Sequence, residues 1–261
     1  MTDGLWRAVY GSVCGTSHVS AGTPCQDFCT VTLKENSERG LLIFACADGA
    51  GSAKHSEEGS RIACERLTSV ILETIENAFD VSAITKTEVQ HWFDRIRIEI
   101  EERAAELEVP SRELATTLLG GVISAENACF IQIGDGSMVV KREERFECVF
   151  WPQSGEYANT TNFITDREFA RALEVTIFDE PIDEFVAFTD GLERLILNFS
   201  ERRVHEPFIQ PMLSTLRRSL DAEPFFEPLR SFLNSAKVNE RTDDDKTLIL
   251  ATRLRDADYV L

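Results

Sequence analysis

Apolar residues recur along the chain in two patterns, short runs typical of strands and spacings of three and four typical of helices. The helical pattern covers Glu57 to Phe79, then a segment from Thr85 to Leu107, and later the region between Val204 and Ala236. Thr85 and Glu88 have the spacing of a capping box, so the second helix is predicted to begin there. Each helix has one apolar side and therefore needs a sheet or another helix to cover it.

Strands are predicted where short apolar runs are bounded by turn residues. These runs are Ala8 to Val13, Phe28 to Leu33, Leu41 to Ala47, Gly120 to Ser124, Ala128 to Ile133, Met138 to Lys141, Phe146 to Phe150, Phe185 to Phe188 and Thr247 to Ala251. Strands interleaved with paired helices predict an α+β fold, with two mainly antiparallel sheets in a central sandwich flanked by helix pairs. Since no linker-like tract or internal repeat is evident, we expect one domain over residues 1–261.

Composition narrows the classes of partner. Asp and Glu number 45 against 27 Lys and Arg, a formal charge of −18, which disfavours nucleic acid and anionic membranes. The longest apolar run, Leu41 to Ala47, is too short to cross a bilayer, and the first residues do not resemble a secretory signal. The seven cysteines are odd in number and form no CxxC motif. They therefore argue against a disulfide framework or a structural zinc site, and we expect a reducing cytoplasm.

Three aspartates stand directly after an apolar strand and directly before a glycine. They are Asp48 in IFACADGAG, Asp135 in FIQIGDGS and Asp190 in FVAFTDGL, and the acidic run Asp243 to Asp245 precedes the last strand. A single Asp-Gly pair is typical of a tight turn. However, strand ends that lie side by side can bring carboxylates together, where they repel unless they share protons or hold a cation. Oxygen ligands favour Mg²⁺, Mn²⁺ or Ca²⁺, so spacing alone leaves both the turn and the metal site open.

Six short motifs in a fixed order resemble those of the metal-dependent serine/threonine protein phosphatases of type 2C. The motifs are CQD (Cys25 to Asp27), ADGAGSA around Asp48, ATTLLGG (Ala115 to Gly121), IGDGS (Ile133 to Ser137), FTDGL (Phe188 to Leu192) and DDKTLIL (Asp244 to Leu250). The GTSHVSAGTPCQD opening and the PQSGEYANTTNF segment, Pro152 to Phe163, are similar to a bacterial branch of that family. The resemblance extends from about Val13 to Ala251.

This resemblance implies a centre of two Mn²⁺ or Mg²⁺ ions at one end of the sandwich, with a third, weaker ion beside it. The implied ligands are Asp48, which bridges both ions, and the Gly49 carbonyl, which binds one of them. Asp190 and Asp244 complete the other ion, Asp27 acts at the second metal directly or through water, and Asp135 binds the third ion. The implied activity is hydrolysis of phosphoserine and phosphothreonine by a metal-activated water, with Asp48 and Asp190 acting through the metals. Phosphorylated proteins, and the serine/threonine kinase that produces them, are the implied partners.

Two positions depart from the family pattern. The phosphate-binding arginine of the family falls at Gly22 here, so His18 or a nearby arginine is the expected replacement. The histidine that many relatives carry after the first Asp-Gly is absent, because Ala50 and Ala53 occupy that region. His55 lies close by, but a histidine on a surface helix is the favoured interpretation.

Other interpretations stay open at this point. Cys25 stands beside the CQD motif and is interpreted as a small buried side chain, because a metal-activated water needs no thiol nucleophile. A catalytically silent, phosphatase-like binding module is one alternative, disfavoured because every expected metal aspartate is present. Another metal phosphoesterase, such as a nuclease, is a second alternative, and the acidic composition counts against it.

Overall fold

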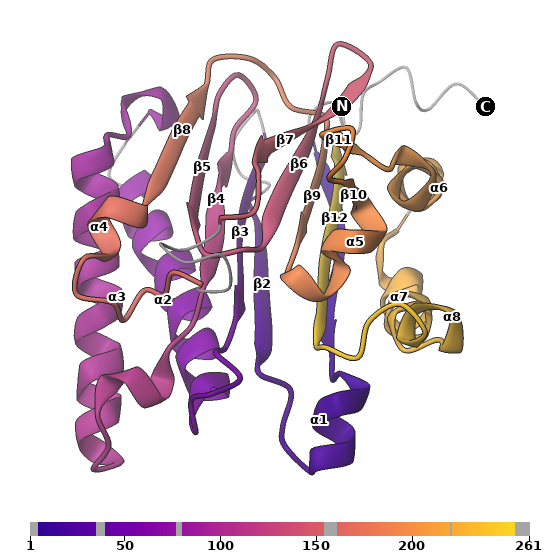
Figure 1. The fold of residues 1–261 in the computed structure, drawn as a ribbon. Helices are drawn as coiled ribbons and strands as arrows, with labels where there is room; N and C mark the ends of the chain where they lie inside the picture. Colours follow the sequence, from indigo (N-terminus) through magenta and orange to yellow (C-terminus); the bar gives the residue numbers. More distant parts are fainter. Residues whose placement is uncertain (1–4, 35–39, 77–79, 154–160, 220, 254–261) are drawn as a thin grey trace.

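Two five-stranded antiparallel sheets pack face to face (Figure 1). The structure is a computed structural model and describes residues 5–34, 40–76, 80–153, 161–219 and 221–253. The sheet that we call the β1 sheet contains, in order, β1 (Trp6–Val13), β12 (Lys246–Arg253), β9 (Glu184–Phe188), β6 (Ser137–Arg142) and β7 (Arg145–Phe150). The β2 sheet contains, in order, β2 (Asp27–Lys34), β3 (Leu41–Asp48), β4 (Leu118–Ile123), β5 (Ala128–Ile133) and β8 (Glu174–Phe178).

Helices cover the outer face of each sheet (Figure 1). The long helices α2 (Ser56–Glu76) and α3 (Lys86–Glu106) pack against each other, and α2 lies on the β2 sheet. On the β1 sheet lie α6 (Glu206–Arg218) and α7 (Phe226–Leu233). The shorter elements are α1 (Thr16–Ala21), α4 (Phe169–Ala172), α5 (Glu193–Ile196), α8 (Ala236–Asn239), the pair β10 (Leu197–Asn198) and β11 (Arg203–Val204), and 3-10 helices at Val81–Ala83, Ser111–Leu114, Asp190–Leu192 and Glu223–Phe225. The predicted sandwich of sheets flanked by helix pairs is confirmed.

Aromatic side chains fill the space between the two sheets. Phe44 and Phe130 of the β2 sheet meet Phe185 of the β1 sheet, with ring centroids 4.2 Å and 5.9 Å from that of Phe185. All three side chains are fully buried. Burial of one such side chain contributes roughly 1.5–3 kcal/mol, and a shift of one residue along a strand exposes it. This packing fixes the strand register, and with it the place where each strand ends.

The predictions of secondary structure are most accurate where all the residues that determine a feature lie within one short segment. In the capping box of α3, the Glu88 backbone N–H donates to Thr85 Oγ1 and the Thr85 N–H donates to the Glu88 carboxylate, at 3.2 Å and 3.1 Å. The helix predicted between Val204 and Ala236 is present as two separate helices, α6 and α7, with a 3-10 turn at Pro224 between them. Strand β8 and helix α1 were not predicted.

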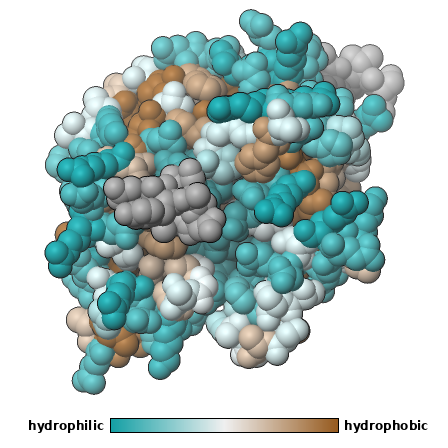
Figure 2. Space-filling view, in the orientation of Figure 1, coloured by the Kyte–Doolittle hydropathy of each residue, from teal (hydrophilic) through white to brown (hydrophobic). Residues whose placement is uncertain are grey.

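Some predicted positions lie outside the described residues. They are 77–79 at the end of the first predicted helix and 154–160 within the PQSGEYANTTNF segment. Over the described part of the chain, no helix combines the length and the apolar character that a membrane crossing requires. Figure 2 shows one face of the molecule, on which hydrophilic residues predominate and apolar residues form scattered patches between them.

Candidate metal centre

The strand order brings aspartates from both sheets to one end of the sandwich. Asp48 is the last residue of β3, and Asp27, the first residue of β2, is its partner in the antiparallel register. Asp190 follows β9 of the opposite sheet after a single intervening residue, and Asp135 lies where the chain crosses from β5 to β6. Four acidic residues that are distant in sequence are therefore supplied by rigid strand ends.

Three of these carboxylates form a close group. One carboxylate oxygen each from Asp48, Asp135 and Asp190 lie within 4.8 Å of one another. Burial raises the pKa of all three, and for Asp190, burial followed by the charges of Asp135 and Asp244 raises it to about 7. Three ionised carboxylates this close repel strongly in a partly buried site. The group therefore favours either shared protons or a bound cation.

Asp27 is held beside this group by hydroxyl groups from the opposite sheet. Its Oδ2 accepts hydrogen bonds from Thr189 Oγ1 and Thr247 Oγ1, both at 2.7 Å. The Thr247 hydroxyl is also 2.7 Å from Ser12 Oγ. Burial raises the pKa of Asp27, although the two threonine hydrogen bonds oppose this effect. Its Oδ1 is buried and finds no hydrogen-bond partner among the described residues, so one oxygen is fixed and the other is free for a ligand.

The glycines after the three aspartates are required by close packing and not by a positive φ angle. None of Gly49, Gly136 and Gly191, all within the described residues, has a positive φ angle. A Cβ atom at Gly49 would lie 2.7 Å from Ser56, and one at Gly136 would lie 2.8 Å from the Phe188 carbonyl oxygen. A Cβ atom at Gly191 would collide with the Asp245 carbonyl oxygen. A left-handed backbone conformation is therefore not the reason for these glycines, and close packing against neighbouring segments excludes a side chain at each of them.

Asp244 lies outside this group of three carboxylates, but its charge affects their pKa values. Its charge contributes to the raised pKa values of Asp48, Asp135 and Asp190, but it does not join the three within 4.8 Å of one another in the described structure. Its Oδ1 accepts a hydrogen bond of 2.9 Å from the backbone N–H of Asp245. Asp27 is likewise outside the group, whereas Asp135, the expected ligand of a weaker ion, is inside it.

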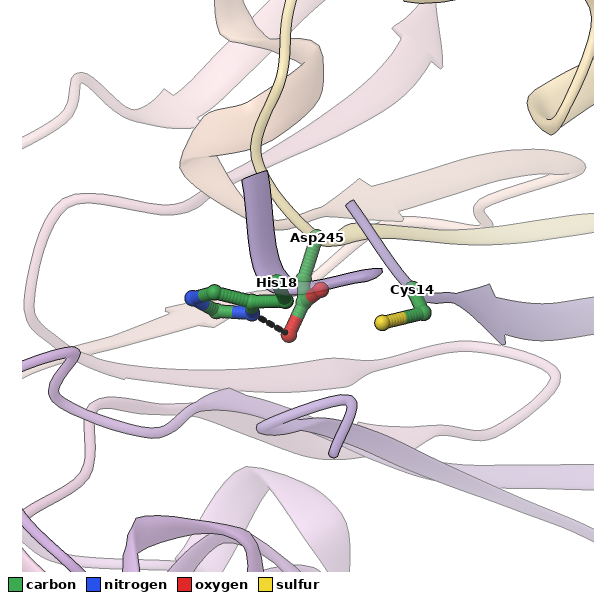
Figure 3. Close-up of side chains that lie close together, drawn as sticks. All are labelled: Cys14, His18 and Asp245. Carbon is green, nitrogen blue, oxygen red and sulfur yellow. Dashed lines mark ion pairs between the residues drawn. The ribbon is translucent and has the colours of Figure 1, made fainter. Parts of the chain in front are cut away.

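The predicted histidines and cysteine lie elsewhere. His18, on α1, places Nδ1 2.9 Å from Asp245 Oδ2 (Figure 3). His55 lies 3.9 Å from Glu58 just before α2, and within the described residues it does not join the carboxylate group. The thiol of Cys25 is 3.7 Å from the Asp27 carbonyl oxygen, and burial raises its pKa, as an unreactive side chain requires.

Three residues that organise the site were given no role from the sequence, although Asp245 was noted as part of the acidic run before the last strand. Thr189 and Thr247 orient Asp27, and Asp245 receives backbone N–H groups from Gly15 and Gln26, both at 2.6 Å. Each lies inside a motif that was noticed for its other residues, FTDGL or DDKTLIL. A polar residue that stands next to a candidate ligand and begins or ends a buried strand was the available indication.

Comparison with known proteins gives close agreement over most of the chain. The sequence profile described as protein phosphatase 2C matches residues 14–234. Serine/threonine-protein phosphatase 3 of Escherichia coli (strain K12) is 38% identical over 252 residues, which cover 94% of this chain and 98% of the relative.

Solved structures share the same architecture at lower identity. A bacterial serine phosphatase has a TM-score of 0.63 at 15% identity, covering 96% of this chain and 98% of its own. The serine/threonine phosphatase Stp1 from Staphylococcus aureus has a TM-score of 0.60 at 16% identity, with 97% of each chain covered. RsbX in complex with magnesium has a TM-score of 0.53 at 14% identity, with coverages of 95% and 96%. At these identities the similarity establishes a shared fold.

Proposed function

The chain belongs to the protein phosphatase 2C family, and from this membership we propose that it is a metal-dependent phosphatase acting on phosphoserine and phosphothreonine in proteins. The observation that carries the proposal is the convergence of Asp48, Asp135 and Asp190 at the end of the sandwich. A nearly full-length relative named as a serine/threonine-protein phosphatase supports the substrate class.

The residues present fit divalent metal ions. The donor atoms are carboxylate oxygens, with the backbone carbonyl of Gly49 nearby, and such hard ligands suit Mg²⁺ and Mn²⁺. Oδ1 of Asp27 and Oδ1 of Asp135 are both buried without a hydrogen bond among the described residues. Buried oxygens without partners are costly, and a cation or a water bound to a cation provides one.

We assign the ligands of two Mn²⁺ or Mg²⁺ ions as follows. Asp48 and the Gly49 carbonyl would contribute ligands to these ions, Asp190 and Asp244 would hold one ion, Asp27 would hold the other, and Asp135 would hold a third, weaker ion. When bound, these ions supply the positive charge that attracts the phosphate and acidifies the attacking water.

The protein's own groups keep these ligands in place for hydrolysis. Thr189 and Thr247 orient the Asp27 carboxylate, and the Thr161 hydroxyl donates to Asp135 Oδ2 at 2.6 Å. Preorganised carboxylates lower the cost of arranging charge during the reaction. Water rather than a side chain attacks the phosphorus, so no thiol is needed and Cys25 keeps its proton.

For the substrate phosphate we propose His18 as the contact that replaces the arginine missing at position 22. Asp245 lies against Nδ1 of the ring, and Figure 3 shows Nε2 on the side of the ring away from Asp245. A histidine oriented by a carboxylate presents its other nitrogen in a defined direction, as a phosphate contact requires. The relevant measurement is the KM for phosphopeptide in His18→Ala, which we expect to rise more than kcat falls.

The proposed partners are phosphorylated proteins and the serine/threonine kinase that produces them, and the proposed compartment is the cytoplasm. All seven cysteines are free thiols in the structure, which suits a reducing compartment. The silent-module alternative lacks support, because the aspartates of the centre are present and buried together. The nuclease alternative is disfavoured because a formal charge of −18 repels nucleic acid.

The deciding experiment measures phosphate release from a phosphothreonine peptide after dialysis against EDTA, with and without added Mn²⁺. We expect turnover only with the metal and a clear preference over the matched phosphotyrosine peptide. Asp48→Asn is the inactive control, and its fold is checked by circular dichroism. Turnover at the wild-type level in EDTA, or in Asp48→Asn, contradicts the proposal.

A further inference from the structure

A second group of potential metal ligands comes from the connection between β1 and α1, from α1 itself and from the segment before β12. Cys14 Sγ, His18 Nδ1 and a carboxylate oxygen of Asp245 are within 4.8 Å of one another. Figure 3 shows the Asp245 carboxylate between the imidazole and the thiol. Among the described residues, this is the one such group that contains a cysteine. A thiol, an imidazole and a carboxylate form a donor set that differs in kind from the all-oxygen group described above.

The group is preorganised by contacts that do not involve a metal. The backbone N–H groups of Gly15 and Gln26 hold the two oxygens of Asp245, each at 2.6 Å. The Ser17 N–H and hydroxyl both donate to the Asp243 carbonyl oxygen, at 2.9 Å and 2.7 Å. These bonds dock α1 on the segment before β12, so all three ligands are already in place. Asp245 is almost fully buried, whereas the His18 side chain is 20% exposed, and an ion can therefore enter from solvent.

One buried atom in the group lacks a satisfactory partner. His18 Nδ1 lies 2.9 Å from Asp245 Oδ2, yet among the described residues it makes no hydrogen bond of acceptable geometry. A buried ring nitrogen that faces a carboxylate without a proper hydrogen bond is expected to have another partner. A cation placed between the nitrogen, the carboxylate and the neighbouring thiol is such a partner.

We propose that Cys14, His18 and Asp245 form a second metal site, selective for Zn²⁺ or a similar thiolate-binding ion and separate from the carboxylate group. Thiolate and imidazole ligands favour zinc, whereas Mg²⁺ and Mn²⁺ favour the oxygen ligands of the other group. Three protein ligands leave one tetrahedral position for water. The sequence hides this site because it has no CxxC motif, and Asp245 lies about 230 residues from the other two ligands.

The distances suit such an ion after a small adjustment. Zinc bond lengths place tetrahedral ligand atoms about 3.3–3.8 Å apart. The 2.9 Å between His18 Nδ1 and Asp245 Oδ2 must therefore widen by about half an ångström, and the longest distance in the group, which is within 4.8 Å, must shorten by at most about 1 Å. On binding, the Cys14 thiol releases its proton to solvent and His18 keeps its proton on Nε2. Affinity consequently increases as pH rises.

Occupancy ties α1 to the segment that carries Asp244, and so stabilises the framework of the phosphatase site. The ion binds Nδ1 of His18, so Nε2, the proposed phosphate contact, stays available. A ligand that binds only the folded state raises the melting temperature in proportion to the logarithm of its concentration. The site itself does not depend on the proposed function.

Cobalt titration tests the site directly, because Co²⁺ bound to thiolate gives an intense charge-transfer band in the near ultraviolet and Co²⁺ bound only to oxygen does not. The full chain is freed of metal, kept reduced with a phosphine, and titrated with Co²⁺ and then Zn²⁺. We expect a band that saturates at one equivalent, is removed by one equivalent of Zn²⁺, and is absent in Cys14→Ser. His18→Gln should weaken Co²⁺ binding by at least ~10-fold.

Cys148→Ser is the matched control, since Cys148 is a half-buried thiol on β7 in no metal-ligand group of the described residues. The band should persist in this variant. No band in the wild-type protein, or a band that survives Cys14→Ser, overturns the inference. Phosphopeptide turnover with Mn²⁺ is measured in parallel, so that loss of turnover with an intact cobalt band contradicts the proposed function alone.

Discussion

Asp190→Asn in the metal-free protein tests whether the three carboxylates share one buried space. In the wild-type fold, burial and the charges of Asp135 and Asp244 raise the pKa of Asp190 to about 7 from an ordinary value of 3.8. The folded state therefore holds this proton more tightly than the unfolded state. A group of this kind stabilises the fold at low pH, and its contribution is lost as pH rises from about 4 to about 7. Asparagine does not titrate, so the variant escapes that loss.

The size of the effect follows from the pKa. Between pH 5 and pH 8, the free energy of unfolding of the wild type falls by the equivalent of about two pKa units, which is about 3 kcal/mol. Asp190→Asn should therefore gain about 3 kcal/mol more over wild type at pH 8 than at pH 5. For a chain of this length the difference is roughly 5–10 °C in melting temperature. Replacing the carboxyl group with an amide can also change the free energy of unfolding by an amount that does not depend on pH. This amount is the same at pH 5 and pH 8, so it cancels when the two pH values are compared.

The assay is thermal and urea unfolding of both proteins in EDTA at pH 5 and pH 8. Asp94→Asn, an exposed position on α3, is the matched control and should show no such pH-dependent gain. Added Mn²⁺ should reverse the order at pH 8, because the ion stabilises wild type more than the variant. If Asp190→Asn gains no more at pH 8 than at pH 5, the carboxylates are not confined together and the reasoning fails.

Three further outcomes are expected. Asp48→Asn should abolish phosphopeptide turnover in a folded protein, whereas Asp135→Asn should reduce turnover by about 10–100-fold. Equal kcat values for the two variants would contradict the ligand assignment. Thr247→Val removes a donor from buried Asp27 and should cost about 1–3 kcal/mol in urea unfolding, with weaker Mn²⁺ binding by calorimetry. Thr215→Val, at an exposed position of α6, should change neither. Mn²⁺ affinity should increase with pH up to about pH 7, because the ion must displace protons held by the carboxylates. Calorimetry in two buffers should detect the release of these protons. A pH-independent affinity with no proton release argues against this linkage.

The sequence could predict those features that one contiguous segment carries. Helices α2 and α3 have an apolar side readable from spacing, and the Thr85 capping box lies within four residues. The strand that ends in Asp48 and the strand that ends two residues before Asp190 were predicted because apolar runs stop abruptly at each motif. Strand β8 was missed because it is a half-buried edge strand of only five residues, next to β5 alone.

The connections within the site could not be predicted from spacing. The two hydroxyls that hold Asp27 come from residues 162 and 220 positions later in the chain. Only the packing of one sheet on the other brings them together. For the same reason, the sequence did not show that Asp135, and not Asp27, joins Asp48 and Asp190 in the group whose oxygens lie within 4.8 Å of one another.

The hydroxyl contacts of Asp27 have a mechanical consequence. Asp27 begins a strand of the β2 sheet, while Thr189 and Thr247 belong to the β9 and β12 side of the sandwich. The centre therefore spans the interface between the two sheets, and any fluctuation that separates the sheets also separates the ligands of the centre. Separation of the sheets requires exposure of Phe44, Phe130 and Phe185, so it is rare in the native state. Loss of catalytic geometry and loss of the central hydrophobic layer should accordingly form one cooperative event, seen as amides of β2 and β12 that exchange hydrogen at the same rate as the whole molecule unfolds.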